Sequence, residues 1–394
     1  MISVKEAIDL VSENSSLLPG VLVELTSSLG YVLAEDVHSP IPHPPFNQSA
    51  MDGYAVGSFN KNEVHDRFKL VGEIKAGDSS TVSLLPGEAV RIFTGGMVPD
   101  GTMSVIMQEV VTANGSEITI KGDIKLNSHI RPLGEQIKKG QLALSKGTQL
   151  TPAGIGFLCG LGITHVTVYP QPKIGIIITG SELVQAGTPL LAGQIYESNS
   201  ATIIAALRST GFDVTVTETV EDDLPLTIST IKKMMAAVDV IILSGGISVG
   251  DYDHVGIALQ KLGVDTIFYK VKQKPGKPIF FGKTSECMFF ALPGNPSASL
   301  LCYYQYVLPA IRKMSGIESI FLEKKLLPLQ SSYVKKGNRA HFLKAVVKGN
   351  EVSSLHGQSS SMLHTFAISN ALVFIPEDKD EVKSGELVEV HLLP

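Results

Sequence analysis

Three acidic residues, Glu182, Asp222 and Asp253, each follow the end of a predicted strand. Carboxylates gathered at strand ends can hold Mg²⁺ against phosphate oxygens, because this hard cation prefers oxygen ligands. Each acid also has an ordinary structural interpretation: Asp222 could cap the helix that begins after Asp223, and Glu182 could complement the dipole of a first helical turn. Convergence of all three acids on one crevice favours the metal site.

Two further stretches could bind phosphate. LSGGISVG (Leu243–Gly250) follows a predicted strand and contains Gly245 and Gly246, whose backbone N–H groups could surround an anion. It lacks the GK[ST] ending of a P-loop and the GxGxxG spacing, so the signal is weak. LPGNP places Pro293 and Pro296 around a strand-to-helix turn that presents N–H groups to an oxyanion, although a plain tight turn explains it equally well.

A row of lysines follows in YKVKQKPGKP. Lys270, Lys272 and Lys274 occupy alternate positions, and Lys277 comes after the Pro275–Gly276 turn. Alternate residues of a strand point to one face, where ammonium groups repel one another unless an anion or water separates them. A solvated edge strand therefore competes with an anion site, and the turn beside a strand end tilts the interpretation toward anion binding.

The elements that must position these residues are three uninterrupted apolar runs, Ile174–Ile178, Val238–Leu243 and Met288–Leu292. Such runs are typical of strands buried on both faces of a parallel sheet. Helical patterns that begin near Ser198 and Leu224 separate the runs. The sequence therefore predicts a doubly wound α/β domain, whose ligands bind beyond the carboxyl ends of the strands.

The rest of the chain is predicted to be rich in short strands, so the fold class is multidomain, α/β plus β. The predicted domains are residues 1–43 and 141–170 as an elongated linking domain, 44–140 as an inserted β-rich domain, 171–317 as the α/β domain and 318–394 as a C-terminal β domain.

Composition excludes several classes of protein. A net charge of −5 gives no overall attraction to nucleic acid or to an anionic membrane, and no apolar run is long enough to cross a bilayer. Cys159, Cys287 and Cys302 lack CxxC spacing, which argues against a disulfide framework or a zinc site and fits a reducing cytoplasm. The ten histidines show no HExxH spacing, and no Ser-His-Asp arrangement stands out, so covalent catalysis is disfavoured.

A series of motifs occurs in one order between about residue 40 and residue 300: NQSAMDGYAV, RIFTGG, ITGSEL, GQIYESN, VEDD, SGGISVGDYD, KPGKP and LPGNPSAS. Together they resemble the molybdopterin molybdenumtransferases (MoeA), a family related to the C-terminal domain of gephyrin. The resemblance implies an L-shaped, four-domain chain with a MogA-like α/β domain. It also implies a homodimer in which each active site is built from both subunits.

The activity that the resemblance implies is the insertion of molybdate, a substrate, into adenylylated molybdopterin with Mg²⁺-dependent release of AMP. The molybdopterin adenylyltransferase is then an expected partner. The residues expected to be catalytic are Asp52, Thr94, Asp222 and Asp253, and those expected to hold the metal are Glu182, Asp222 and Asp253. The residues expected to bind substrate are Glu182, Gly245, Gly246, Lys270, Lys274, Lys277, Pro293, Pro296, Arg131 and Ser360. From pattern alone, Asp52 and Thr94 indicate nothing more than turns.

Two departures from the family pattern affect these expectations. RPLGEQ matches the family's R-x-x-G-E-D except that Gln136 replaces the aspartate, which leaves Arg131 and Glu135 as the matching residues. Near the C-terminus the family's Gly-Ser-Gly appears as Ser359–Ser361, and loss of both glycines restricts the backbone.

Three alternative functions stay open on the sequence alone. A molybdopterin adenylyltransferase has one domain that resembles residues 171–317, but it usually stands alone. A gephyrin-like scaffold would leave the carboxylates idle, and a nucleotide hydrolase of the competence-damage type would not need LPGNP. Release of AMP from adenylylated molybdopterin in the presence of molybdate would distinguish all of these.

Overall fold

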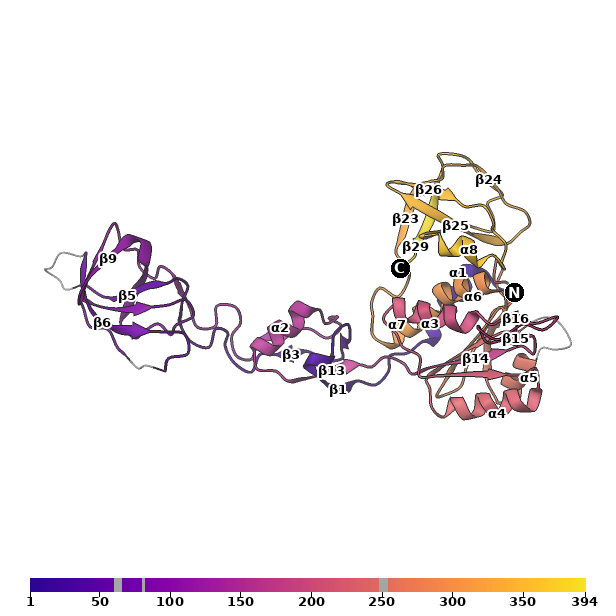
Figure 1. Cartoon of the computed structure of the whole chain (residues 1–394), viewed down its shortest axis with the longest axis horizontal. Helices are drawn as coiled ribbons and strands as arrows, with labels where there is room; N and C mark the ends of the chain where they lie inside the picture. Colours follow the sequence, from indigo (N-terminus) through magenta and orange to yellow (C-terminus); the bar gives the residue numbers. More distant parts are fainter. Residues whose placement is uncertain (60–65, 80–81, 248–253) are drawn as a thin grey trace. The chain divides into compact units, whose positions relative to one another are not determined.

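The computed structural model describes residues 1–59, 66–79, 82–247 and 254–394. The chain divides into two compact units (Figure 1). The larger unit consists of Met1–Val21, Gly30–Ala34 and Val168–Pro394, and the smaller unit of Leu22–Leu29 and Glu35–Thr167. The predicted division into four domains is finer than these two units and stays a prediction.

The larger unit is built on a six-stranded sheet in the order β17-β14-β18-β22-β21-β19. The strands are β14 (Ile174–Thr179), β17 (Val216–Val220), β18 (Val240–Ser244), β19 (Asp265–Tyr269), β21 (Phe280–Lys283) and β22 (Met288–Leu292). The pairs β17–β14, β14–β18 and β18–β22 are parallel, whereas β21 and β19 continue the sheet antiparallel. The three predicted apolar runs form β14, β18 and β22, and every residue of these strands is buried.

Helices cover both faces of this sheet (Figure 1). Successive strand residues point to opposite faces, so Ile176 packs in the core with α3 (Asn199–Ser209), whereas Ile177 packs in the core with α4 (Leu224–Met235) and α5 (His254–Lys261). The first face also carries α1 (Val4–Asn14), α6 (Pro296–Cys302), a π-helical turn η3 (Tyr303–Val307) and α7 (Leu308–Met314). This arrangement is the predicted doubly wound α/β fold.

The N-terminal helix α1 belongs to this core although the rest of the core lies far along the chain. Ser3 caps the helix by accepting a hydrogen bond from the backbone N–H of Glu6. Val4, Ala7 and Val11 are buried on one face of the helix, at the spacing of an amphipathic helix.

The C-terminal part of the larger unit is a β-sheet in the order β20-β25-β27-β29-β23, with β26 paired to β25. Its elements are β20 (Gln273–Lys274), β23 (Lys324–Pro328), β25 (Ala340–Lys348), β26 (Glu351–Ser354), α8 (Leu363–Ala367), β27 (Ala371–Ile375) and β29 (Leu387–Leu392). The edge strand β20 comes from the lysine-rich segment, so this segment joins the C-terminal sheet. A small core of Leu, Val, Ala and Ile side chains supports the sheet.

The smaller unit contains a six-stranded sheet in the order β8-β5-β7-β6-β10-β9. Its strands are β5 (Gly53–Gly57), β6 (Arg67–Ile74), β7 (Glu88–Ile92), β8 (Thr102–Met107), β9 (Val111–Asn114) and β10 (Glu117–Ile120). Alternate residues of β5 enter two separate cores: Val56 packs with Phe68, and Ala55 packs with Val90. The β-rich character predicted for this region is confirmed.

Short elements complete the chain. They are β1 (Val21–Glu24), η1 (Leu25–Ser27), β2 (Val32–Leu33), β3 (Val37–His38), β4 (Gln48–Ser49), η2 (Gln108–Val110), β11 (Ile130–Arg131), β12 (Leu142–Leu144), α2 (Pro152–Gly160), β13 (His165–Tyr169), β15 (Leu183–Val184), β16 (Ile195–Tyr196), β24 (Tyr333–Val334) and β28 (Glu381–Val382). Across the part of the chain that the structure describes, no helix has the length and apolar character needed to cross a membrane.

Candidate functional site

A cleft of about 600 Å³ opens beyond the carboxyl ends of β14, β18 and β22. Parallel strands bring the loops that follow them to one edge of a sheet, which is where doubly wound folds bind ligands. The lining residues are Thr179, Gly180, Glu182, Leu183, Ile195, Tyr196, Glu197, Ser198, Asn199, Asp222, Ser244, Gly245, Gly246, Ile247, Pro278, Pro293, Gly294, Asn295 and Pro296. The volume lies in the range of small-molecule sites.

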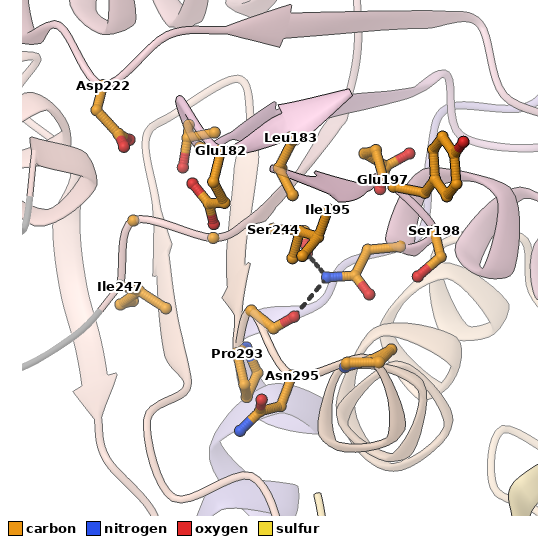
Figure 2. A pocket seen from close by; sticks show the side chains of 18 of the residues that line it. Glu182, Leu183, Ile195, Glu197, Ser198, Asp222, Ser244, Ile247, Pro293 and Asn295 are labelled. Carbon is orange, nitrogen blue, oxygen red and sulfur yellow. Dashed lines mark hydrogen bonds between the residues drawn. The ribbon is translucent and has the colours of Figure 1, made fainter. Parts of the chain in front are cut away.

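The cleft brings together two of the three predicted acids. Glu182 and Asp222 both line it and are both exposed, and Figure 2 shows them on one side of the pocket. Asp222 Oδ2 accepts a hydrogen bond of 3.2 Å from the backbone N–H of Ser181, which ties the two acid-bearing loops to each other. Asp253 lies outside the described residues.

The alternative role of Asp222 as a helix cap is wrong, because its neighbour performs that role. Asp223 Oδ1 accepts a hydrogen bond of 2.8 Å from the backbone N–H of Leu226 and caps α4. Asp222 is therefore directed to the cleft. Two exposed carboxylates fit a magnesium ion, which commonly binds one or two protein carboxylates together with water and substrate phosphates. The described residues contain no cluster of three or more His, Cys, Asp or Glu side chains able to hold a metal ion.

The glycine turn after β18 forms the floor of the cleft beside Thr179. Gly245 and Gly246 have φ angles of +92° and +61°, a conformation that favours glycine. A Cβ atom on Gly245 would lie 2.3 Å from the carbonyl oxygen of Thr179, and one on Gly246 would lie 2.7 Å from its hydroxyl oxygen. Both positions therefore require glycine for conformation and for space.

The turn between β22 and α6 lies across the cleft from the acids, where Figure 2 shows Pro293 and Asn295. It is held by Asn199, whose Nδ2 donates hydrogen bonds of 2.8 Å to Ser244 Oγ and of 2.8 Å to the Gly294 carbonyl (Figure 2). Asn199, the first residue of α3, thus connects this helix to the ends of the neighbouring strands β18 and β22.

Helix α3 is capped by an acid of the cleft. Glu197 accepts hydrogen bonds from the backbone N–H and the hydroxyl of Ser200, with 2.9 Å to the nitrogen. Glu197 and Asn199 are two of the lining residues that sequence reasoning missed. The motif GQIYESN, which contains both, was the available signal.

Ser360 also reaches the LPGNP turn, although it does not line the cleft. Asn295 Nδ2 donates a hydrogen bond of 2.9 Å to Ser360 Oγ, and the backbone N–H of Ser297 donates one of 3.1 Å to the Ser360 carbonyl. The buried ammonium group of Lys344 holds this loop by donating to the carbonyls of Ser359 and Met362, at 3.1 and 2.9 Å. Burial lowers the pKa of Lys344.

The predicted single face of alternating lysines is wrong. Strand β19 ends at Tyr269, and Lys270 has a φ of +69°, which breaks the extended conformation that alternation requires. Lys270 Nζ lies 4.5 Å from the centre of the Tyr269 ring, and Lys274 belongs to β20. Lys270, Lys274 and Lys277 do not line the cleft, to which this segment contributes Pro278.

Lys274 instead belongs to a cationic group around the buried side chain of His341. Burial, followed by the positive charges of Lys274, Lys335 and Arg339, lowers the pKa of His341 to about 4. The Tyr333 hydroxyl lies 2.8 Å from His341 Nδ1 and holds the ring. A neutral imidazole is thus retained among positive charges, and Lys335 and Arg339 are members of this group that sequence reasoning missed.

The remaining residues expected at the site, Asp52, Thr94 and Arg131, lie in the smaller unit. Asp52 Oδ1 accepts hydrogen bonds of 2.8 Å from the backbone N–H of Thr94 and of 2.8 Å from its hydroxyl. These two bonds, with a smaller contribution from Arg91, lower the pKa of Asp52. Arg131 and Ser49 lie in the paired strands β11 and β4, and Ser49 bonds in turn to the glycines that follow Thr94.

Arg91 is held beside Asp52 by aromatic rings. Its guanidinium carbon lies 4.9 Å from the centre of the Tyr54 ring and 5.2 Å from that of Phe93, and its Nη2 donates a hydrogen bond of 2.5 Å to Gln108 Oε1. Stacking on two rings restricts the guanidinium and maintains a positive charge near the carboxylate.

Comparison with known families matches nearly all of the chain. Residues 2–162 match the MoeA N-terminal region (domains I and II), residues 175–313 a probable molybdopterin-binding domain, and residues 327–393 the MoeA C-terminal region (domain IV). The chain is 36% identical over 382 residues to the molybdopterin molybdenumtransferase of Haemophilus influenzae, with 94% of each chain covered. It is 31% identical over 401 residues to that of Staphylococcus aureus, with 99% of this chain and 95% of the relative covered.

Among solved structures, the chain resembles the molybdopterin biosynthesis MoeA protein from Pyrococcus horikoshii. The TM-score is 0.84 and the identity 28%, with 100% of this chain and 99% of that chain covered. The likeness extends over both units and agrees with the fold class predicted from the sequence.

Proposed function

The chain belongs to the MoeA family of molybdopterin molybdenumtransferases, and from this membership we propose that its cleft inserts molybdenum into adenylylated molybdopterin with Mg²⁺-dependent release of AMP. The chain is an enzyme of molybdenum cofactor biosynthesis, a molybdopterin molybdotransferase. The adenylylated form of the substrate and the metal ion belong to the proposal. The observation that supports both is the presence of Glu182 and Asp222 in one cleft with the glycine turn and the LPGNP turn.

In the proposed reaction the phosphoanhydride bond is cleaved by water, which gives AMP and the terminal phosphate of molybdopterin. The dithiolene sulfurs replace one oxide of molybdate, and that oxygen leaves as water with the two thiol protons. Glu182 and Asp222 would hold Mg²⁺, with Asp253 as the third acid. When bound, this ion would neutralise charge on the phosphate oxygens.

Residues of the chain would orient the substrate. The Gly245–Gly246 turn lines the cleft, and its N–H groups would receive a phosphate oxygen, because backbone donors in such turns bind anions. Pro293 and Pro296 would fix the opposite turn, to which Ser360 is hydrogen-bonded through Asn295. The KPGKP motif leads us to propose that Lys270, Lys274 and Lys277 also bind substrate. The cationic group around His341 supports the binding of an anion near Lys274.

The group around Asp52 would act on the cleft of a second copy of the chain. Asp52, Thr94 and Arg131 lie in the smaller unit, whereas the cleft lies in the larger unit. The family resemblance leads us to propose a homodimer whose sites combine both. We also propose a cytoplasmic location and delivery of the substrate by the molybdopterin adenylyltransferase.

The test is AMP release from adenylylated molybdopterin, measured by chromatography at fixed molybdate while Mg²⁺ is titrated. Asp222→Asn should lower the rate about 100-fold, since the loss of one preorganised charge-stabilising group costs about this factor. The concentration of Mg²⁺ needed for half-maximal rate should also rise. Glu221→Gln is the matched control, because Glu221 is exposed, directly precedes Asp222 and does not line the cleft. AMP release from Asp222→Asn at the normal rate, or without any dependence on Mg²⁺, would contradict the proposal.

A further inference from the structure

The hydroxyl of Thr179 is a buried donor without a partner in the wall of the cleft. Thr179 is the last residue of β14, only 4% of its surface is exposed, and it lines the cleft. Its Oγ1 makes no hydrogen bond in the part of the chain that the structure describes. A buried hydroxyl without a partner destabilises the folded protein, so its presence calls for a partner that binds from the cleft.

The glycine turn after β18 lies beside this hydroxyl. Thr179 Oγ1 lies against the Gly245–Gly246 turn, so close that a Cβ atom on either glycine would approach it within 3.0 Å. The backbone N–H groups of Gly246 and Ile247 follow in this turn, and neither donates to a backbone or side-chain acceptor among the described residues. A hydroxyl and unpaired N–H groups next to one another in a cleft form a binding site for a negatively charged oxygen.

We propose that Thr179 Oγ1 binds a phosphate oxygen of the nucleotide substrate, together with the N–H groups of the glycine turn. This inference rests on the proposed function and adds a residue to it. A phosphate is favoured over a metal ion because a cation would be repelled by the N–H groups, whereas the carboxylates of Glu182 and Asp222 in the same cleft offer the oxygen ligands that a cation prefers. Besides phosphate, molybdate is a tetrahedral oxyanion that could occupy this binding site.

Thr179→Val replaces the hydroxyl with a methyl group of similar shape and gives two opposite expected effects. Binding of AMP, measured by isothermal titration calorimetry, should weaken about 10- to 100-fold, the loss expected for one hydrogen bond to a charged group. Without ligand, the variant should melt at the same temperature or roughly 2–4 °C higher, because no polar group is left unpaired. Thr179→Ser should retain most of the affinity for AMP.

The matched control is Thr227→Val. Thr227 is as deeply buried, but its hydroxyl donates a hydrogen bond of 2.7 Å to the Asp223 carbonyl. This variant should melt at a lower temperature than the unmodified protein and bind AMP normally.

Binding measurements with inorganic phosphate and with molybdate show which anion binds at Thr179. Phosphate should compete with AMP in the unmodified protein and lose affinity in Thr179→Val. The inference is overturned if Thr179→Val binds AMP normally, if it melts at a lower temperature without ligand, if the unmodified protein binds neither AMP nor phosphate, or if only molybdate binding is lost. A protein that binds AMP through Thr179 but releases none from adenylylated molybdopterin would contradict the proposed function and leave this inference intact.

Discussion

Replacement of Asn199 tests whether the two turns that line the cleft at the ends of β18 and β22 must be held together. Its side-chain amide donates to Ser244 Oγ and to the Gly294 carbonyl, at 2.8 Å each, and Ser244 is only 1% exposed. A hydrogen bond contributes about 0.5–1.5 kcal/mol net, so Asn199→Ala should lower the free energy of unfolding by about 1–3 kcal/mol. The rate of AMP release should fall as well, because the LPGNP turn is then free to move away from the end of β18.

Asn199→Asp separates geometry from charge. The Ser244 hydroxyl can rotate and donate to the new carboxylate, but the Gly294 carbonyl cannot, so two oxygens would face each other. The added negative charge would also repel an anionic substrate in a cleft that already contains Glu182 and Asp222. Asn199→Asp should therefore raise KM more than Asn199→Ala does, and salt should reduce the difference between the two variants.

Urea denaturation followed by circular dichroism, combined with the AMP-release assay, measures both effects. Asn370→Ala is the matched control, because the Asn370 side chain also makes two hydrogen bonds, with the backbone of Val347 in the C-terminal sheet. The control should lose stability and keep its activity. The reasoning is refuted if Asn199→Ala unfolds and releases AMP as the unmodified protein does, or if both alanine variants lose activity equally.

Two further predictions concern pH. Thr94→Val removes one of the bonds that lower the pKa of Asp52, so an NMR titration should show that pKa rising toward about 3.9, while Thr94→Ser should retain the low value. Because the folded pKa of Asp52 is lowered, its stabilising effect is present above the ordinary aspartate pKa and is lost as pH falls through the lowered value. The folded pKa of His341 is lowered to about 4, so between pH 6.5 and 4 the unfolded chain binds a proton that the folded chain does not. The free energy of unfolding should fall as pH decreases through this window, and His341→Gln should flatten the dependence; an equal slope in that variant would contradict the assignment.

Local sequence pattern was sufficient for three adjacent parallel strands of the sheet and for the edge at which the cleft opens. Uninterrupted apolar runs identified β14, β18 and β22, and the parallel arrangement follows from the helices between them. Once strands are parallel, residues directly after them must gather at one edge, which is why Glu182 and Asp222 converge. Fold class and the approximate place of the site could therefore be predicted.

The remaining features depend on backbone detail or on distant contacts. A single positive φ at Lys270 ends the strand alternation, and lysine gives no local signal for that conformation. The choice between Asp222 and Asp223 as helix cap depends on where the first turn of α4 begins. Asn199 meets partners 45 and 95 residues away, and Asp52 meets Thr94 42 residues away, so no window of local sequence contains these pairs.

The position of α1 in the core of the larger unit has a consequence for biosynthesis. Lys313 Nζ donates a hydrogen bond of 2.5 Å to the carbonyl of Ser12, which lies 301 residues earlier in the chain. At about 5–20 residues per second, a ribosome needs about 15–60 s to make that interval. Throughout this time the apolar face of α1, with Val4, Ala7 and Val11, has no permanent cover. The apolar face of α1 therefore waits for its cover until α7 has left the ribosome.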